Sequence, residues 1–327
     1  MEQVENPTNG NEDTETTQNT ETQSKSTIKF DNHKYFDLIE SLKSGHPKHF
    51  IILVRHGERS DDPEREILSE NDRLEPQVKF DCHLTDKGSK QAFQTGEFIK
   101  EQVIEANNLD FTSSDIKVFT SPFLRCIQTV SEIIDGMGYK VPNITINDRL
   151  GEFLLKSWFD SIEKPLAHLT INHVKHSKFQ QKYLGKESKF KFTRFYGQDA
   201  TPNEFDSNVV EEDPENCVTA MESNTVIKYP ETYSDMFYRY SGIINEIIYQ
   251  EFFENAEEIS QKSKIVLIVS HGFSVDPFIN AFSPDHPNIV SVDYCATSIA
   301  EKLSNEENFE LILKGDAKHC GLNPATF

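Results

Sequence analysis

Two histidines in this sequence stand one residue beyond strongly apolar runs, and each is itself followed by a glycine. His56 stands immediately after Arg55 and three residues before Arg59. His271 follows the second apolar run. A guanidinium group pairs bidentately with phosphate oxygens, and a histidine among cations stays neutral and nucleophilic because its protonated form is disfavoured. These residues therefore predict that a histidine attacks a phosphoryl group, forming a phosphohistidine that water then hydrolyses.

Further polar residues stand where we expect other strands to end. Arg125 lies one turn into a helix expected after a strand at 115–121. Asp148, Arg149 and Glu152 follow a strand expected at 143–148. Arginines in this number can neutralise the oxygens of a transferring phosphoryl group, so the chemistry needs no metal and no cofactor.

Alternating strands and helices must bring these residues together. Apolar runs and helical spacing predict strands at 50–54, 115–121, 143–148, 265–269, 291–303 and 308–315, and helices at 85–106, 121–138, 232–259 and 273–282. Thr85 and Ser121 are predicted as helix caps rather than catalysts. Continuous apolar strands indicate a mainly parallel sheet in a three-layer α/β/α sandwich, whose ligands lie beyond the carboxyl ends of the strands.

Two stretches do not follow this alternation. Residues 1–27 are polar and nearly devoid of aliphatic side chains, which predicts a disordered tail before a single domain at 28–327, and a lead-in helix is expected at 28–42. Residues 160–231 contain a basic, aromatic half and then an acidic half. We expect either a surface insertion with self-complementary charge or a cap beside the site.

The composition excludes several classes of function. A net charge of −21 disfavours nonspecific binding to nucleic acid or to anionic membranes. The sequence has no apolar signal segment and no transmembrane run, and no Cys-x-x-Cys pair, so we expect reduced thiols and a cytoplasmic location. The five cysteines are Cys82, Cys126, Cys217, Cys295 and Cys320.

Four motifs together resemble a known family. The stretches LVRHGERSD, LTDKGSKQA, SPFLRCIQT and IVSHG, in this order, resemble the histidine phosphatase superfamily (branch 1), which has the phosphoglycerate-mutase-like fold. RHGER and SPFLRCIQT are most similar to the phosphatase domain of the UBASH3/Sts proteins. The resemblance spans about 48–160 and 230–315, and leaves out the tail and most of the insertion.

The resemblance implies roles for individual residues. His56 matches the nucleophile that becomes phosphohistidine, and His271 matches the second histidine of the pocket. The pocket arginines are Arg55, Arg59 and Arg125. Glu152 matches the acid that protonates the leaving oxygen and later activates water, with Asp148 and Asp61 as alternatives.

The predicted function is hydrolysis of phosphomonoesters, either phosphotyrosine proteins or small phosphoesters. Gly272 after His271 disfavours the phytase branch, and Arg59 to Asp61 after the first motif disfavours a mutase. A phosphoglycerate mutase or sugar-bisphosphate phosphatase of the same fold, and a non-catalytic phosphate-binding scaffold, are the alternatives. The expected partner is the phosphorylated substrate, with neither nucleic acid nor membrane, and a homodimer is left open. His83 and His319 are expected to be ordinary surface or loop residues.

Overall fold

The computed structural model describes most of the chain from residue 47 onward, and all described residues lie in one compact unit, Leu42–Phe327. The tail at 1–27 and the helix predicted at 28–42 lie outside the described residues. The described residues are 47–61, 79–107, 109, 115–141, 143–159, 162, 164–172, 176–185, 190–196, 219–222, 227–254, 262–289 and 291–326.

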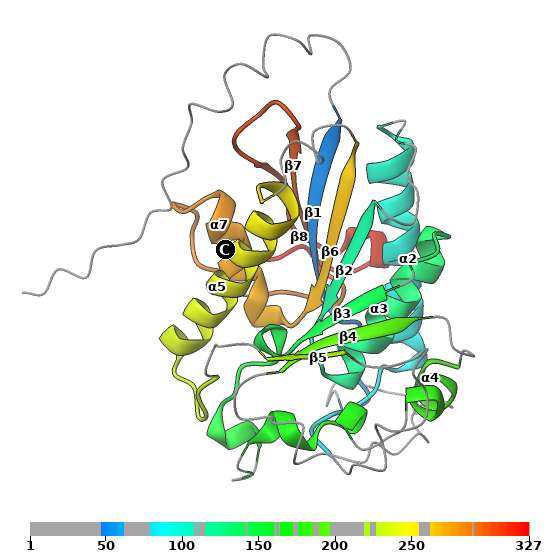
Figure 1. The fold of residues 1–327 in the computed structure, drawn as a ribbon, viewed down its shortest axis with the longest axis vertical. Coiled ribbons are helices and arrows are strands. Elements are labelled where there is room, and N and C mark those ends of the chain that lie inside the picture. Colours follow the sequence, from blue (N-terminus) through cyan, green and yellow to red (C-terminus); the bar gives the residue numbers. More distant parts are fainter. Residues whose placement is uncertain are drawn as a thin grey trace, which may run out of the picture. The chain divides into compact units, whose positions relative to one another are not determined.

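A central sheet organises the described part of the chain, with strand order β5-β4-β3-β2-β6-β1-β7-β8. Figure 1 shows β1, β6 and β2 lying side by side. The strands from β5 to β1 pair in parallel, and β7 and β8 are antiparallel. The strands are β1 Lys48–Arg55, β2 Ile116–Thr120, β3 Asn143–Asn147, β4 Lys191–Tyr196, β5 Thr219–Glu222, β6 Lys264–Ser270, β7 Thr297–Leu303 and β8 Glu310–Asp316.

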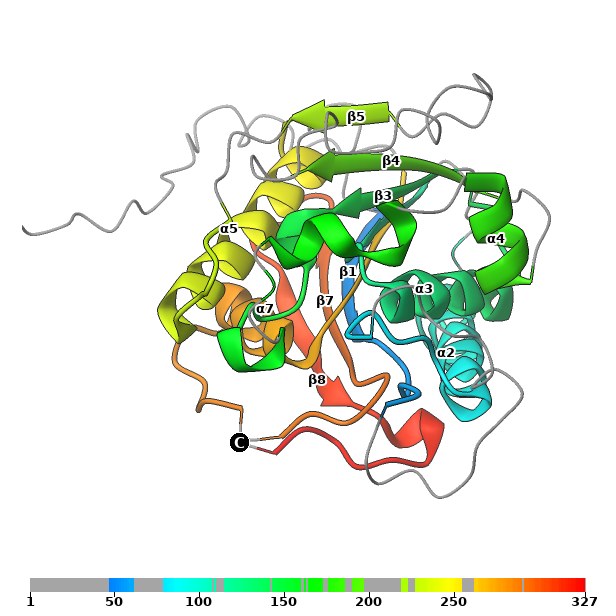
Figure 2. The same cartoon turned by 90° about the horizontal axis from the view of Figure 1, so that it is seen from below.

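Helices cover both faces of this sheet, which confirms the predicted three-layer α/β/α sandwich with a mainly parallel sheet. Figure 2 shows α2 and α3 on one face and α5 and α7 on the other. The α-helices are α2 Asp86–Ile99, α3 Leu124–Met137, α4 His176–Leu184, α5 Tyr233–Phe252 and α7 Val275–Phe282. The π-helix η3 is Lys100–Glu105, and the 3-10 turns are η4 Asp148–Leu150, η5 Lys156–Trp158, η6 Pro165–His168, η7 Thr170–Asn172, η9 Gly272–Ser274 and η10 Lys318–Cys320.

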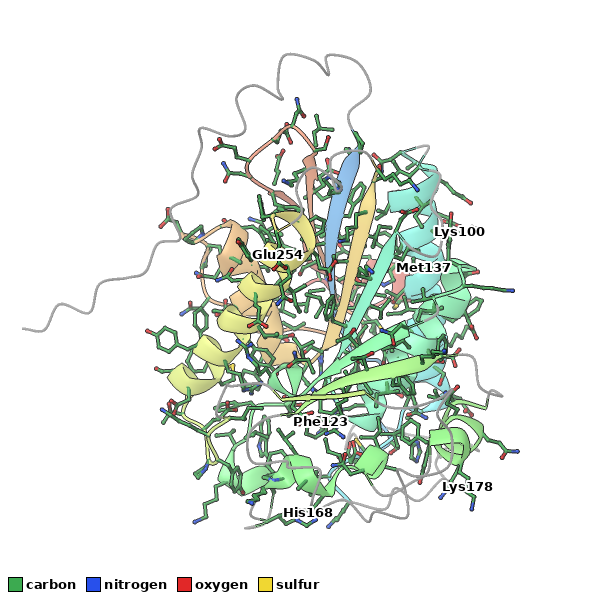
Figure 3. All side chains as sticks on the ribbon, viewed as in Figure 1. Lys100, Phe123, Met137, His168, Lys178 and Glu254 are labelled. Carbon is green, nitrogen blue, oxygen red and sulfur yellow. The ribbon has the colours of Figure 1, made fainter. Side chains whose placement is uncertain are left out.

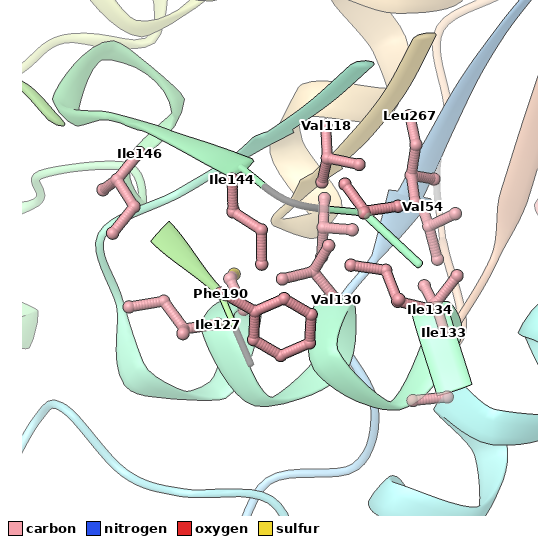
Figure 4. Packing of buried hydrophobic residues seen from close by; sticks show 14 of the residues in the cluster. Val54, Val118, Ile127, Val130, Ile133, Ile134, Ile144, Ile146, Phe190 and Leu267 are labelled. Carbon is pink, nitrogen blue, oxygen red and sulfur yellow. The ribbon is translucent and has the colours of Figure 1, made fainter. Parts of the chain in front are cut away.

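Side chains of β1 alternate between two separate cores. Ile52 and Val54 belong to the cluster beneath α2 and α3, part of which Figure 4 shows, whereas Ile51 and Leu53 join the cluster beneath α5 and α7. Successive side chains of a strand point to opposite faces of its sheet. A strand that is apolar at every position must therefore be covered on both faces, and this burial fixes the end of β1 in place.

Local sequence signals set most helix ends, with one exception. Thr85 caps α2 by accepting a hydrogen bond from the Gly88 N–H at 2.9 Å, as predicted. Gly138 ends α3 with a left-handed φ of 73°, a conformation that glycine adopts at little cost. The prediction for Ser121 was wrong: α3 begins at Leu124, and the hydroxyl of Ser121 turns instead toward the site.

The region 160–231 is more than a surface appendage where the structure describes it. Its strands β4 and β5 extend the central sheet beyond β3 in parallel pairing. Arg194 on β4 is buried and reaches back to Asp148 with Nη2···Oδ1 at 3.0 Å. This part of the predicted insertion is therefore built into the main sheet. In the described part of the chain, no helix combines the length and apolarity needed to cross a bilayer.

Candidate active site

The parallel strands deliver the predicted residues to one edge of the sheet. Arg55 at the end of β1 pairs in register with Ser270 at the end of β6, and Thr120 at the end of β2 lies beside Val269 of β6. The residues that follow these strand ends therefore meet. One of these residues is His271. Phe123, labelled in Figure 3, packs edge-on against its imidazole, with the two ring centroids 5.1 Å apart.

His56 is held from its backbone and from one ring nitrogen. Its N–H donates to the Ser270 carbonyl at 2.9 Å, and its carbonyl accepts from the Cys295 N–H at 3.2 Å. Its Nδ1 lies 2.8 Å from the Gly57 carbonyl, which can only accept, so Nδ1 carries the proton. The lone pair of a neutral His56 is therefore on Nε2.

Gly57 and Gly88 let two backbone segments meet closely beside His56. A Cβ on Gly57 would lie 2.5 Å from the Gly88 carbonyl oxygen, which no real side chain could occupy without moving the backbone. A glycine follows each of the two histidines in the sequence, and at Gly57 this close approach of backbone requires one. Gly272 is under no such constraint, because the nearest atom to a Cβ there would be Arg55 Nε at an ordinary 3.5 Å.

Arg125, Glu152 and His271 form a buried triad of contacts. Arg125 Nη2 lies 3.0 Å from Glu152 Oε2, and His271 Nδ1 lies 3.1 Å from the same oxygen. The imidazole of His271 meets that of His56 edge-on, with ring centroids 5.3 Å apart. The structure thus brings together four of the predicted site residues.

Ser121 sets the hydrogen-bonding state of His271. Its Oγ lies 2.8 Å from His271 Nε2, and it also accepts from the Phe123 N–H at 3.3 Å. If His271 donates through Nδ1 to the Glu152 carboxylate, Nε2 accepts the Ser121 hydroxyl proton, which satisfies both nitrogens of a neutral ring. Sequence reasoning missed this role because Ser-Pro before a helix is also the usual pattern of a cap.

Burial and neighbouring charges shift the protonation of all three titratable groups. Burial, followed by the charges of Arg125 and Arg55, lowers the pKa of His56 well below its usual value. Burial also lowers the pKa of His271 to about 4, although Glu152 opposes this shift. Both imidazoles are therefore neutral at neutral pH, the form that a nucleophile requires.

Glu152 is ionised in the same environment. Burial alone would raise the pKa of Glu152, but His271 and then Arg125 lower it well below its usual value. Its second oxygen, Oε1, accepts from the Phe153 N–H at 3.0 Å. Both oxygens of the carboxylate therefore accept hydrogen bonds within the site.

Two guanidinium groups of the site carry buried donors with no partner among the described residues, namely Arg55 Nε and Arg125 Nε. Arg55 also stacks over the ring of Tyr294 at 4.3 Å and donates to the Val292 carbonyl. A buried donor without a partner costs free energy, and an incoming anion would remove that cost. Tyr294 was not predicted, because it follows no strand and carries no motif.

Other predicted candidates lie at the rim or elsewhere. Arg59 is partly exposed and pairs with Asp61 at 3.0 Å, and its charge acts on Arg55. Asp148 is committed to Arg194, as described above. Arg149 extends away to Glu246 of α5, with Nη1···Oε2 at 2.5 Å.

A buried clamp, also missed by sequence reasoning, fixes the loop that carries Glu152. Arg239 of α5 donates to the carbonyls of Arg149, Gly151 and Glu152 at 2.6, 2.9 and 3.1 Å. Glu231 pairs with Arg239 at 2.6 Å. No motif marks these residues, since their role depends on contacts nearly ninety positions apart.

His56, Glu152 and His271 each offer a ligand atom, and these atoms lie within 4.8 Å of one another. Such a set has the donors of a zinc site. However, Arg125 already neutralises the Glu152 carboxylate, and Arg55 adds a second fixed cation. The surroundings therefore favour an anion between the arginines over a divalent cation.

Comparison with known families agrees with the motifs. Residues 51–188 match the histidine phosphatase superfamily (branch 1). This match contains His56, Arg125 and Glu152, and supports the resemblance to that superfamily and its phosphatase or mutase chemistry. No curated protein sequence matches the chain.

Several solved structures resemble the chain at low sequence identity. The ecdysone phosphate phosphatase of Bombix mori, in complex with tungstate, is 15% identical, with 81% of this chain and 92% of that chain covered and a TM-score of 0.47. The phosphoserine phosphatase of Entamoeba histolytica, in complex with 3-phosphoglyceric acid, is 15% identical, with 83% and 99% covered and a TM-score of 0.42. The phosphoglycerate mutase of Bacillus anthracis is 13% identical, with 84% and 96% covered and a TM-score of 0.40.

Proposed function

We propose that the chain hydrolyses phosphomonoesters through a phosphohistidine on His56 without a metal or cofactor. The observation that carries this proposal is a neutral, buried imidazole with its lone pair on Nε2, beside two guanidinium groups whose buried Nε donors have no partner in the described part of the chain. Arg55 and Arg125 would bind the phosphoryl oxygens and stabilise the charge that develops on them.

In the first step, His56 Nε2 attacks phosphorus and the bond to the leaving oxygen breaks. The leaving oxygen needs a proton, which Glu152 would supply. A phosphate dianion beside Glu152 competes for Arg125 and repels the carboxylate, and both effects raise its pKa from the low value of the free site. Substrate binding would therefore prepare Glu152 to act as the acid.

In the second step, water attacks the phosphohistidine and the N–P bond breaks. Glu152, now ionised, would take the proton of that water, and phosphate and neutral His56 are released. His271 would keep the carboxylate oriented through its Nδ1–H, with Ser121 holding the other ring nitrogen.

An aromatic cluster supports a substrate with an aromatic leaving group, which includes phosphotyrosine. The rings of Phe153, Trp158 and Phe273 contact one another pairwise, with centroids 5.2 to 6.1 Å apart. Phe153 directly follows Glu152, and Phe273 stands two residues after His271. Trp158 and Phe273 keep 46% and 38% of their surface exposed, so they can still stack on a ligand.

The similarity of RHGER and SPFLRCIQT to the UBASH3/Sts phosphatase domain is consistent with this substrate class. Trp158→Ala should lower kcat/KM for phenyl phosphate about 2- to 13-fold, with methyl phosphate unaffected, because one aromatic contact contributes about 0.5–1.5 kcal/mol. Tyr238→Ala is the matched control, since Tyr238 is an exposed aromatic residue of α5. Equal losses for both substrates would argue against the aromatic leaving group.

The decisive test follows phosphate release from p-nitrophenyl phosphate by the wild type and by His56→Ala. We expect the variant to lose at least about 10³-fold in kcat, as removal of a nucleophile does. Rapid quenching of the wild type should trap a label that survives alkali and is lost in acid, as a phosphohistidine is. Trp158 is the only tryptophan of the chain, so its fluorescence can report phosphate binding by both proteins.

Two outcomes would replace the proposal. Isomerisation of a phosphoglycerate without release of phosphate would identify a mutase. Binding of phosphate with no turnover of aryl, alkyl or sugar phosphates would identify a phosphate-binding scaffold.

A further inference from the structure

A buried threonine on α3 joins the loop of the nucleophile to the helix that carries Arg125. Thr129 is fully buried, and its Oγ1 accepts the Gly57 N–H at 3.0 Å. The same Oγ1 donates to the Arg125 carbonyl at 2.7 Å. Gly57 and Thr129 are 72 positions apart along the chain. One hydroxyl group therefore contacts both the residue after His56 and the backbone of Arg125, and the proposed reaction gives it no role.

Thr95 of α2 shows what a threonine in such a helix does without contact to the nucleophile's loop. A threonine inside a helix often donates to the carbonyl four residues earlier, and that bond alone needs no further explanation. Thr95 is also fully buried, and its Oγ1 donates to the Gln91 carbonyl at 2.9 Å. Its other partner is His319 Nε2 in the turn η10, at 2.9 Å. What distinguishes Thr129 is therefore its second bond, to Gly57.

Gly57 is the residue through which the loop sets the imidazole of His56. Its carbonyl accepts from His56 Nδ1 at 2.8 Å, which leaves the lone pair on Nε2. Its N–H is the donor to Thr129, so both backbone polar groups of Gly57 are bound within the site. A glycine has no side chain to restrict its backbone dihedrals. These two hydrogen bonds therefore fix the orientation of the Gly57 carbonyl, and with it the position of the His56 proton.

We propose that Thr129 is a positioning residue for the nucleophile, and that by holding Gly57 it keeps the His56 proton on Nδ1 and the lone pair on Nε2. Without the hydroxyl, the Gly57 N–H is a buried donor with no acceptor, and the loop lowers its free energy by turning this group toward another partner. The Gly57 carbonyl then leaves Nδ1, and the His56 proton can move to Nε2, where it removes the nucleophilic lone pair. The effect on rate rests on the proposed phosphatase activity, whereas the position of the proton is a property of the folded protein alone.

Loss of the Thr129 hydroxyl should slow the chemical step rather than weaken the binding of phosphate. The groups that would bind the phosphoryl oxygens are the side chains of Arg55 and Arg125, and Thr129 bonds only to the backbone of Arg125. The Arg125 guanidinium is held separately, by Glu152 at 3.0 Å. A displacement of about 1 Å at a reacting group can cost about 10²-fold in rate, so we expect Thr129→Val to lower kcat about 10- to 10²-fold.

The experiment compares Thr129→Val with Thr95→Val in the full chain, because each change replaces a buried hydroxyl by a methyl group. Release of phosphate from p-nitrophenyl phosphate gives kcat, and Trp158 fluorescence gives the affinity for inorganic phosphate. Both variants should unfold at a lower urea concentration, but only Thr129→Val should lose kcat, with its affinity for phosphate retained. Thr129→Ser keeps the hydroxyl and should restore most of kcat. Thr129→Val should still fold, since Gln91 Oε1 holds the next N–H of the loop at 2.9 Å.

The position of the His56 proton is measured by ¹⁵N NMR of the histidine rings in the same proteins. A protonated and an unprotonated ring nitrogen differ in chemical shift, so the two neutral forms of an imidazole can be distinguished. Comparison with His56→Ala assigns the His56 signals among the eleven histidines of the chain. The wild type and Thr95→Val should carry the proton on Nδ1, whereas Thr129→Val should show a mixture with the Nε2 form.

Three results would overturn the proposal: an unchanged proton position in Thr129→Val, an unchanged kcat in that variant, or an equal loss of kcat in Thr95→Val. If Thr129→Val does not fold, Thr129→Cys must meet the same criteria with smaller changes, because sulfur is a weaker hydrogen-bonding group. A wild-type protein that never releases phosphate would refute the proposed function and the effect on rate. The proton positions in the Thr129 and Thr95 variants would still decide whether Thr129 orients His56.

Discussion

Two buried arginine–carboxylate pairs follow β3, and only one of them meets histidines. Arg194 pairs with Asp148 and also donates to Asn172, and both partners of the ion pair are almost fully buried. Arg125 pairs with Glu152 at the same 3.0 Å and in similar burial. The two carboxylates are four residues apart, yet Asp148 pairs with Arg194, whereas Glu152 contacts both Arg125 and His271.

The difference lies in how completely each arginine is satisfied. Arg194 uses three nitrogens on Asp148 and Asn172, so its site is closed. Arg125 has an Nε with no partner among the described residues and shares its carboxylate with His271, so its site can still accept an anion. A buried ion pair becomes part of an active site only where its hydrogen bonds remain incomplete and a nucleophile is adjacent.

Matched substitutions of the two arginines should separate these roles most strongly. Arg125→Lys should lower kcat/KM for p-nitrophenyl phosphate by about 10²–10³-fold, since lysine cannot present the guanidinium fork to the phosphoryl oxygens. Arg194→Lys should leave kcat/KM near the wild-type value and lower the free energy of unfolding by about 3 kcal/mol, as a disrupted buried pair does. Steady-state kinetics and urea unfolding measure both. A comparable loss of kcat/KM in folded Arg194→Lys would refute the distinction.

The carboxylates offer a second matched test, with a substrate dependence that identifies the acid. Glu152→Gln should lower kcat for an alkyl phosphate about 10²-fold, because the poor leaving group needs a proton. The effect should be much smaller for p-nitrophenyl phosphate, whose leaving group departs without one. Asp148→Asn should show no such dependence on the leaving group. If Asp148→Asn reproduces the pattern and Glu152→Gln does not, Asp148 is the acid.

The pH dependence of stability should also distinguish buried imidazoles from ordinary ones. The pKa of His271 is lowered to about 4, and burial followed by Lys302 and Lys264 lowers that of His49 to about 3. Below the unfolded value of 6.5 the unfolded chain binds protons that the folded chain does not, so stability falls with falling pH, down to about pH 4 for His271 and about pH 3 for His49.

Each such histidine contributes up to about 1.4 kcal/mol per pH unit within its window. Urea unfolding between pH 4.5 and 7.5 measures the slope. His49 lies on β1 and packs against Phe252 away from the site. His49→Gln should therefore reduce the slope and leave kcat unchanged at neutral pH, and an unchanged slope would contradict the assignment.

The sequence predicts the residues that form the site better than the residues that hold them in position. His56, His271 and Arg125 each follow an apolar strand closely, so strand ends alone place them at one edge of the sheet. Ser121 and Arg239 act through contacts about 150 and 90 positions away along the chain. No local pattern encodes such contacts, because they arise only when distant segments pack.

Prediction from the sequence fails most clearly where one sequence pattern is compatible with two different structures. Ser121 before Pro122 looks like a helix cap, and burial of its hydroxyl beside His271 decides otherwise. His83 was expected to be a surface or loop residue, and it lies in the loop before α2 but is buried there, with Nδ1 2.8 Å from the Leu84 carbonyl. Residues 160–231 were expected to form an insertion because they do not follow the alternation of strands and helices, whereas pairing with β3 makes β4 part of the sheet.

The smallest predicted effect concerns the loop between the two pairs. Tyr240 donates its hydroxyl to the Gly151 carbonyl at 2.5 Å, and Arg239 donates to the same oxygen at 2.9 Å. Tyr240→Phe should lower the free energy of unfolding by about 1 kcal/mol, the usual worth of one hydrogen bond. Since Arg239 still holds the loop, kcat/KM should fall only a few-fold.

Tyr233→Phe provides the matched control for this substitution. Its hydroxyl donates to Asp276 at 3.2 Å from a half-exposed position, so water can replace the bond and stability should hardly change. Urea unfolding and kcat/KM for p-nitrophenyl phosphate compare the two variants. A large loss of kcat/KM in Tyr240→Phe, with stability unchanged, would mean that Tyr240 rather than Arg239 sets the position of Glu152. The Tyr240 hydroxyl alone would then hold the loop between Asp148 and Glu152, the carboxylates of the two ion pairs, in place.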